Sequence, residues 1–453
     1  MKSFLPALIL LLVPALHAVP DRSLLLISID GLRTDYLAEA DRHGLKVPHL
    51  RELWAAGVHA SSVLGALPTS TYPSHTTLIT GTSPARHGIA SNQPFSATGE
   101  TSYRWYWYSE DMTSPPLWEA AAAAGYEVGS VSWPVTVGAK GIKYNIADFT
   151  GTRSDEDAKM IRAWAGREFI DELARDAGVL LTDANLGTKR DWARTRYILG
   201  IIRTKKPRFM ITHFVAADHH QHKTGPFSAP ALAAIEEIDE MVGQIVEAMR
   251  REYPNAAVCV VSDHGFSGIT HALALQDAFV RAGLITLKSK QRTLEMGGVQ
   301  DWVAFPWEAG GSAAIVLKNP EDADAQRRTR LALDTLAADS ANGIVRILDR
   351  EQIAQLGGTS RADFWVDLKP GFSFSPLLGG STVLPSSRGG THGHVPTHPE
   401  MSSTFVFVGP GVRQGDVGAI DMRSIAPTLA KFLQVPLPTA ELPALDVFNP
   451  ASR

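Results

Sequence analysis

Acidic residues and histidines fall into four short clusters that lie far apart in the sequence. Two clusters pair a carboxylate with a histidine, one contains a lone carboxylate, and the last contributes a histidine. The residues are Asp30, Asp218, His222, Asp263, His264 and His392. Carboxylates and neutral imidazoles together suit Zn²⁺ or a similar borderline ion, and six such ligands could hold two ions. Taken singly, an aspartate after a strand is more commonly a turn residue or a helix cap.

Three apolar runs would have to bring these clusters together. Residues 23–30, 206–218 and 256–263 are short runs of strand-forming residues, and each ends in an aspartate. Apolar residues recur at helical spacing over 235–249, between the second run and the third. This alternation predicts an α/β fold with a central, mostly parallel sheet flanked by helices. Because ligands collect at the carboxyl ends of parallel strands, we expect the clusters to meet at one edge of the sheet.

A threonine-rich stretch, ALPTSTYPSHTTLITGTSPARHGIASN, occupies residues 66–92. Thr71 stands beside a proline and ahead of an apolar run, a pattern typical of a loop that enters a helix. Free backbone N–H groups point outward at such a helix start and make a natural anion site. The stretch alone leaves open whether Thr71 does chemistry or simply caps the helix.

The composition is that of a folded chain, long enough for one large domain or two ordinary ones. Of 453 residues, 44% are hydrophobic and 20% charged, and the net charge of −4 does not favour a nucleic-acid binder. The single cysteine, Cys259, excludes an intrachain disulfide and a cysteine-based metal site. The patterning is less regular over 266–390, which we predict to be an inserted cap between two parts of the main α/β core, 19–265 and 391–453.

The N-terminus reads MKSFLPALILLLVPALHA, a lysine followed by an apolar run that ends in small residues. This pattern predicts a signal peptide over residues 1–18, with cleavage after Ala18. An uncleaved anchor is the alternative, but the apolar stretch is short for a spanning helix. We therefore expect a secreted protein without stable membrane insertion, and the scarcity of cysteine favours a bacterial periplasm.

Five motifs, in order, resemble the type I phosphodiesterase/nucleotide pyrophosphatase family of the alkaline phosphatase superfamily. They are LISIDGLRTDYL, PTSTYPSHTTLITGTSPARHGIASN, DHHQHKTGP, VSDHGF and GTHGH followed by MSSTFVFVGPG. The resemblance runs from about residue 23 to the C-terminus and is poor over 266–385. It implies an alkaline phosphatase-like fold and a small-molecule phosphate ester as substrate, with nucleotide- and lipid-derived diesters as the candidates, rather than a nucleic-acid duplex.

The resemblance also implies a role for each candidate residue. Thr71 falls where the family has its nucleophile, and Asn92 where it has a residue that binds a phosphoryl oxygen. Two zinc ions per chain are implied. Asp218, His222 and His392 would hold one; Asp30, Asp263, His264 and the Thr71 oxygen would hold the other. Zn²⁺ coordination favours the alkoxide of a threonine, which is otherwise a poor nucleophile.

Several positions bear on specificity. Ser74 stands where many relatives have asparagine, with little effect expected on chemistry. Trp133 and Pro134 match diesterases and pyrophosphatases, and Trp133 could be an aromatic wall or a core residue. Lys140 and Lys143 could add positive charge for a monoester. Four further histidines are interpreted as bystanders: His219, His220, His394 and His398.

These features rank the possible activities. A phosphodiesterase or pyrophosphatase is favoured, and a phosphomonoesterase on the same scaffold is the alternative. A sulfatase would need a cysteine or serine in a C/S-x-P-x-R pattern, which TYPSH lacks. A non-catalytic metal-binding module remains a remote alternative, because no candidate ligand is missing.

Overall fold

The computed structural model describes residues 21–97, 104–149, 154–178, 188–294 and 297–449. The predicted signal peptide therefore lies outside the described residues. Within these ranges, no helix combines the length and the apolar character needed to cross a membrane.

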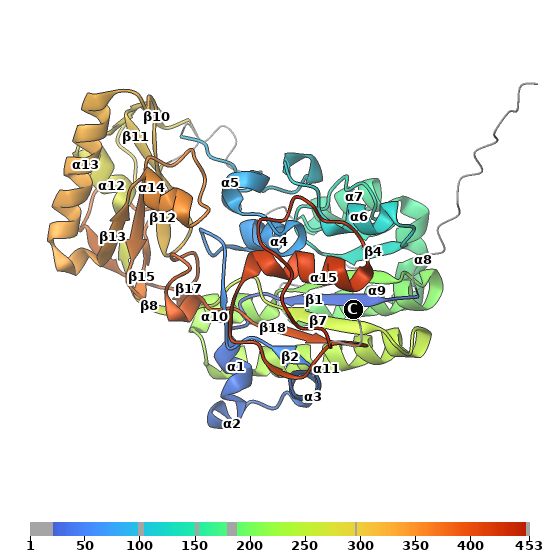
Figure 1. The fold of residues 1–453 in the computed structure, drawn as a ribbon. Coiled ribbons are helices and arrows are strands. Elements are labelled where there is room, and N and C mark those ends of the chain that lie inside the picture. The colour runs from blue at the N-terminus through green and yellow to red at the C-terminus, as the bar shows by residue number, and fades with distance from the viewer. Residues whose placement is uncertain (1–20, 98–103, 150–153, 179–187, 295–296, 450–453) are drawn as a thin grey trace, which may run out of the picture.

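A sheet of eight strands forms the centre of the larger part of the molecule, on the right of Figure 1. The strand order is β19-β2-β18-β7-β1-β6-β4-β5, and the five strands from β7 to β5 are parallel. Strand β18 runs antiparallel to both of its neighbours. The strands are β1 Leu24–Ile29, β2 Val58–His59, β4 Val128–Val131, β5 Tyr144–Ile146, β6 Phe209–Phe214, β7 Ala257–Val261, β18 Phe405–Val408 and β19 Gly415–Asp416. The predicted α/β fold with a mostly parallel central sheet is confirmed.

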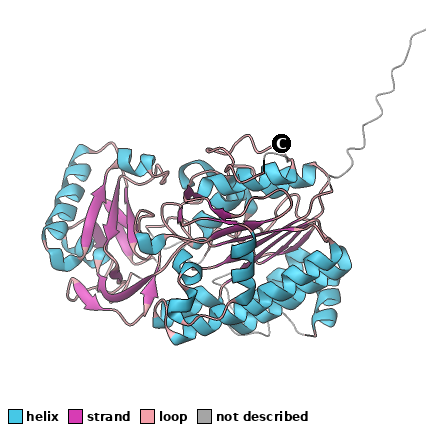
Figure 2. Cartoon of the chain, turned by 60° about the horizontal axis from the view of Figure 1, so that its bottom comes forward, coloured by secondary structure: helices cyan, strands magenta, loops and turns pink. Residues whose placement is uncertain are grey.

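Helices cover both faces of this sheet (Figure 2). On β1, Leu25 and Ile27 pack into one core cluster with α3, α9 and α11, while Leu24 and Leu26 pack into another with α4, α6 and α15. Burial on both faces explains why β1 is apolar throughout rather than alternating. The helices are α3 Pro48–Ala56, α4 Thr71–Thr80, α6 Leu117–Ala123, α9 Thr188–Lys205, α11 Ala229–Glu252 and α15 Ile425–Leu433.

The smaller part, on the left of Figure 1, lies between β7 and β18 in the sequence and has a core of its own. Its antiparallel sheet has the order β11-β12-β14-β13, and a second group of strands forms around β8. The elements are β8 Ser267–Leu273, α12 Leu275–Arg281, β9 Ile285–Leu287, β10 Val299–Trp302, β11 Ala304–Glu308, β12 Ser312–Leu317, α13 Ala323–Ala338, β13 Ile344–Leu348, α14 Arg350–Gln355, β14 Phe364–Leu368, β15 Gly371–Phe374, β16 Val383–Pro385 and β17 Gly390–Thr391. The chain leaves and re-enters the larger part through adjacent strands, because β17 pairs with the start of β8.

Short elements complete the larger part. They are α1 Thr34–Ala38, α2 Ala40–His43, β3 Ser62–Leu64, α5 Pro84–His87, α7 Ser154–Ala165, α8 Arg167–Ala177, α10 Ala216–Thr224 and β20 Ala419–Asp421. One sequence prediction is wrong here: the strand that was expected to end at Asp218 ends at Phe214, and Asp218 lies in the first turn of α10. The apolar run continues past the strand because Ala216 and Ala217 are buried as the first residues of the helix.

Candidate metal centre and substrate cleft

The first group of candidate ligands comes from α10 and from the segment after β17. Asp218 and His222 are four residues apart on α10 and therefore share one face of the helix. Asp218 Oδ1 lies 3.4 Å from His222 Nε2 and 3.7 Å from His392 Nε2. Ligand atoms of these three residues lie within 4.8 Å of one another, close enough to share one ion.

The second group follows the ends of β1 and β7. His264 Nε2 lies 3.3 Å from Asp30 Oδ1 and 3.2 Å from Asp263 Oδ2. The other oxygen of Asp263 accepts hydrogen bonds from the backbone N–H groups of Gly31 and His264, at 3.2 and 3.1 Å. The two groups adjoin, because the rings of His264 and His392 stack with centroids 3.8 Å apart.

Backbone carbonyls orient the histidines of both groups. The Nδ1 atoms of His222, His264 and His392 lie 3.0–3.1 Å from the carbonyl oxygens of Gly390, Gly265 and Thr69. A carbonyl can only accept, so each Nδ1 carries the proton and each Nε2 presents a lone pair. Histidines that ligate metals are held in this way.

The charges and unmet hydrogen bonds of the centre fit a cation. Three carboxylate oxygens that face the two groups have no hydrogen-bond partner within the described ranges: Asp30 Oδ1, Asp218 Oδ1 and Asp263 Oδ2. Burial, together with the nearby carboxylates of Asp263 and Asp218, raises the pKa of Asp30 well above its usual value. Burial and the neighbouring His264 and His222 lower the pKa of His392, which keeps its imidazole neutral. Clustered carboxylates with neutral imidazoles are a donor set for divalent metal ions.

Thr71 stands at the first position of α4, after the N-cap residue Ser70. Its hydroxyl oxygen lies 3.5 Å from His264 Nε2, at the edge of the second group. Asn92 lies beside the same helix start, where its Oδ1 accepts a hydrogen bond of 2.9 Å from the Tyr72 N–H. With Oδ1 engaged as an acceptor, the Asn92 Nδ2 is the part of the amide that remains to donate.

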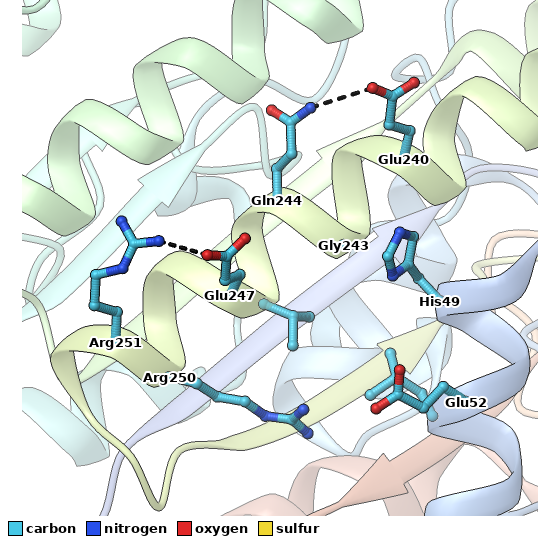
Figure 3. A pocket seen from close by; sticks show the side chains of 10 residues that line it. His49, Glu52, Glu240, Gly243, Gln244, Glu247, Arg250 and Arg251 are labelled. Carbon is cyan, nitrogen blue, oxygen red and sulfur yellow. Dashed lines mark hydrogen bonds and ion pairs between the residues drawn. The ribbon is translucent and has the colours of Figure 1, made fainter.

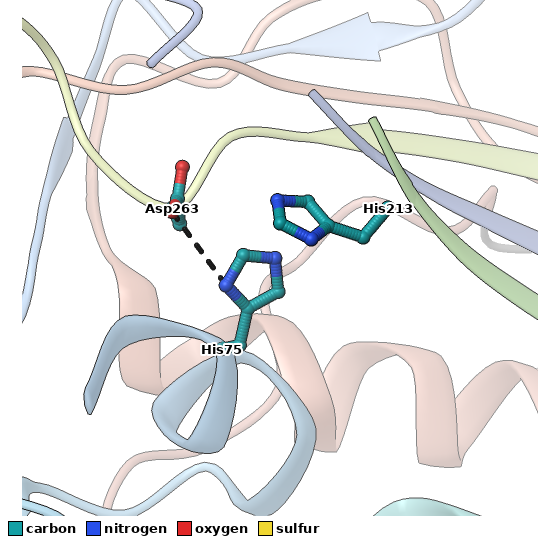
Figure 4. A group of neighbouring side chains, drawn as sticks. All are labelled: His75, His213 and Asp263. Carbon is teal, nitrogen blue, oxygen red and sulfur yellow. Dashed lines mark ion pairs between the residues drawn. The ribbon is translucent and has the colours of Figure 1, made fainter. Parts of the chain in front are cut away.

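Two buried histidines near the second group were missed by the sequence analysis. His75, on α4, and His213, on β6, form with Asp263 a third group of potential ligands (Figure 4). His75 lies within the quoted TYPSH motif, so its position was a usable signal. His213 stands in the run FMITHF and gave no signal, because that run reads as an apolar strand.

A cleft of about 430 Å³ opens beside the centre, between the two parts of the molecule. Asn92, His222 and His392 line it, and so do residues of the smaller part from β11. Its aromatic lining consists of Phe95, Trp105, Phe305 and Trp307, and its charged lining includes Glu308 and Arg388. The cleft can thus hold an organic group next to the candidate metal ligands.

The structure decides between alternatives that the sequence left open for Trp133 and for the two lysines. Trp133 is fully buried in the core, where its ring meets His75 edge-on, so it does not line the cleft. Neither Lys140 nor Lys143 lines the cleft, and Lys143 pairs with Glu127 instead. The aromatic and cationic side chains that do line the cleft include Trp105, Trp307 and Arg388.

The four additional histidines lie outside the three candidate ligand groups of the described residues. His219 and His220 contact each other on α10, and His398 bonds to Asp367 at 2.9 Å. His394 is fully buried. A separate cavity of about 610 Å³ lies between α3 and α11 and contains none of the candidate residues (Figure 3).

The comparison with known families identifies the chain's relatives. A sequence profile of the type I phosphodiesterase / nucleotide pyrophosphatase family matches residues 24–393. The chain belongs to this family. Family membership agrees with the motif resemblance and places the chain in the alkaline phosphatase superfamily.

Curated relatives match only in part. Rat ectonucleotide pyrophosphatase/phosphodiesterase family member 3 is 25% identical over 252 residues, which are 53% of this chain and 24% of that protein. Human family member 5 is 25% identical over 264 residues, 55% of this chain and 46% of that protein. Venom phosphodiesterase 2 of Crotalus adamanteus is 25% identical over 257 residues, 54% of this chain and 27% of that protein. The matched region thus spans from a quarter to under half of these relatives.

Solved structures share the fold over most of the chain. Human ectonucleotide pyrophosphatase/phosphodiesterase 5 matches with a TM-score of 0.64 and 19% identity, covering 94% of this chain and all of that one. An inactive threonine-to-alanine variant of the murine protein, in complex with AMP, matches with a TM-score of 0.62 and 20% identity. These neighbours establish an alkaline phosphatase-like fold.

Proposed function

We propose that the chain hydrolyses phosphodiester or pyrophosphate bonds at a two-zinc centre, with Thr71 as the nucleophile. The observation that carries this proposal is the convergence of six candidate ligands and one hydroxyl from segments between residues 30 and 392. Asp218, His222 and His392 would hold one ion, and Asp30, Asp263 and His264 the other, with the Thr71 oxygen at its edge. When bound, the ions would favour the threonine alkoxide and stabilise charge on the leaving oxygen.

In the first step, the Thr71 hydroxyl gives up its proton to solvent, Oγ1 bonds to phosphorus, and the bond to the leaving alcohol or phosphate breaks, with the leaving oxygen protonated by solvent where needed. The phosphoryl group is then carried on Thr71. In the second step a water oxygen bonds to phosphorus, the bond to Oγ1 breaks, and Thr71 regains a proton. The start of α4 favours the charge that forms on the threonine oxygen, through the partial positive charge of a helix N-terminus.

Few donors are free to bind the phosphoryl oxygens at this helix start. Pro73 has no N–H group, and the Tyr72 N–H is already bonded to Asn92. The Thr71 N–H and the Asn92 Nδ2 are therefore the groups that would meet the equatorial oxygens. Asn92 acts here as an oxyanion donor held in place by its bond to the helix.

The cleft favours a diester over a monoester. A monoester carries one more negative charge, and Arg388 is the only arginine or lysine among the described residues that line the cleft. The aromatic side chains suit the second organic group that a diester has and a monoester lacks. Because a murine structural neighbour was solved with AMP, a nucleotide is a natural candidate for that group.

Paired assays test the proposal. Zinc-loaded protein should hydrolyse bis-p-nitrophenyl phosphate and thymidine 5′-p-nitrophenyl phosphate much faster than p-nitrophenyl phosphate. Thr71→Ala should lower kcat by at least about 1,000-fold, because the attacking oxygen is removed. The variant should keep its zinc, and Thr71→Ser should retain partial activity. A Thr71→Ala variant with near-normal kcat would show that another group attacks, and a preference for the monoester would support the phosphomonoesterase alternative.

A further inference from the structure

Two buried histidine rings lie beside Asp263, a member of the second candidate ligand group (Figure 4). The side chains of His75 and His213 are at most 2% exposed, and their rings meet edge to face with centroids 4.3 Å apart. His75 comes from α4, the helix that begins at Thr71, and His213 from β6, the strand beside β1. With Asp263 they resemble a third metal site, but their hydrogen bonds indicate a different role.

His75 has no lone pair to offer an ion. Its Nδ1 lies 2.8 Å from the carbonyl oxygen of Thr71, which can only accept, so this nitrogen carries the proton. Its Nε2 lies 2.9 Å from Ser28 Oγ and accepts the hydroxyl proton. The same Nδ1–H faces Asp263 Oδ2 at 3.6 Å. His75 therefore links the backbone of Thr71 to β1, the strand that Asp30 follows, and its ring lies beside Asp263 without a hydrogen bond to it.

His213 donates to a candidate ligand rather than replacing one. Its Nε2 lies 3.1 Å from Asp30 Oδ2, a carboxylate oxygen that accepts the proton. Asp30 is thereby held by one oxygen, and the other, Oδ1, faces His264. In the third group, only His213 Nδ1 and Asp263 Oδ2 then remain available as metal ligands. A zinc site typically has at least three protein ligands, so two atoms are too few.

We propose that His213 and His75 are positioning residues of the second candidate ligand group, and that they do not bind a third ion. The proposal rests on the two-metal centre proposed above. His213 fixes the rotation of the Asp30 carboxylate, and His75 ties the start of the nucleophile's helix to β1, the strand that Asp30 follows. Groups that orient metal ligands in this way commonly change metal affinity about 10- to 100-fold when removed.

A pair of amide variants separates the hydrogen bond from the packing. The amide nitrogen of glutamine takes the place of imidazole Nε2, so His213→Gln keeps a donor within reach of Asp30. His213→Asn is shorter and loses it. Zinc titration against a chromophoric chelator should show that His213→Asn weakens one of two sites about 10- to 100-fold, while His213→Gln stays within a few-fold of the original protein.

Two further variants control for folding. His87→Asn alters another buried histidine, which bonds to Thr77 rather than to a candidate ligand, and should leave both zinc affinities unchanged. If His213→Asn does not fold, the zinc affinities of Ser28→Ala and His213→Gln are compared instead. It removes the donor to His75 Nε2 and should weaken the same site while the metal-free melting temperature of the variant stays within a few degrees.

Three results would overturn the proposal. The first is an unchanged zinc affinity in His213→Asn, or in Ser28→Ala if His213→Asn does not fold. The second is an equal loss of zinc affinity in His213→Asn and His213→Gln. The third is a protein that binds three ions per chain and loses one on substitution of His213. Since zinc binding is measured without substrate, a protein that binds two ions but hydrolyses no ester would refute the proposed function alone.

Discussion

Glu308 provides a test in which the sign and size of a pH effect can be worked from the structure. It ends β11 and lines the substrate cleft, and its Oε1 is buried without a hydrogen-bond partner among the described residues. Burial raises the pKa of Glu308 from 4.5 to about 8. The carboxyl group is therefore largely protonated at neutral pH.

The sign follows from proton binding. Between pH 4.5 and about 8 the folded protein retains a proton on Glu308 that the unfolded chain has lost. Stability must therefore fall as the pH rises through this window. Each pKa unit corresponds to about 1.4 kcal/mol of folding stability, so the loss of stability across this window is at most roughly 5 kcal/mol. Because the Glu308 side chain is partly exposed, solvent screening reduces this loss of stability, and we expect it to be about 2–4 kcal/mol.

Glu308→Gln removes the titrating group and keeps its shape. Urea unfolding of the chelator-treated protein should give equal stabilities for the original protein and the variant at pH 5. At pH 9 the variant should be more stable by about 2–4 kcal/mol, because only the original protein then buries a charge. Glu321→Gln, at an exposed position of the smaller part, is the matched control and should not alter the pH dependence. Stability curves of the Glu308 variant and the original protein that run parallel from pH 5 to pH 9 would refute the reasoning.

Two other substitutions test separate parts of the molecule. Asn92→Ala should lower kcat for a diester about 100- to 1,000-fold by removing an oxyanion donor, and should also lower stability by about 1 kcal/mol because the Tyr72 N–H loses its cap. Asn92→Asp, which keeps the cap, should recover the stability but not the activity; recovery of kcat would contradict the donor role. Asp239 is buried on α11 and accepts hydrogen bonds from the backbone of His49 and Leu50, so Asp239→Ala should lower the free energy of unfolding by about 1–3 kcal/mol. Its kcat per zinc-loaded chain should be unchanged, and a large loss of activity would show that the start of α3 influences the centre.

The sequence was sufficient for the fold class because the apolar runs are buried on both faces. Residues 24–29 and 257–261 are buried throughout, and the amphipathic run from Ile235 to Met249 lies on α11. The sequence did not show that Asp218 lies on a helix. Buried alanines at the start of α10 lengthen the apolar run in the same way as strand residues would.

Side-chain direction within the site was the harder problem. A tryptophan beside a proline does not reveal which side of the backbone it faces, and Trp133 turns into the core. The aromatic residues that line the cleft are Phe95 and Trp105, which precede β4 in the sequence, and Phe305 and Trp307 of β11. Their meeting depends on how the smaller part lies against the larger one. No local pattern in the sequence encodes that contact.

The two candidate ligand groups depend on different parts of the fold. Asp30, Asp263 and His264 follow adjacent parallel strands of the main sheet, so the core alone positions them. His392 follows β17, whose position is set by pairing with β8, and Gly311 of the smaller part donates its N–H to the His392 carbonyl at 2.8 Å. The position of His392 therefore depends on contacts with the smaller part, whereas the second group needs none of them. Under the proposed function, the region that lines the cleft would also complete one of the two metal sites, so substrate recognition and assembly of the centre would depend on the same contacts.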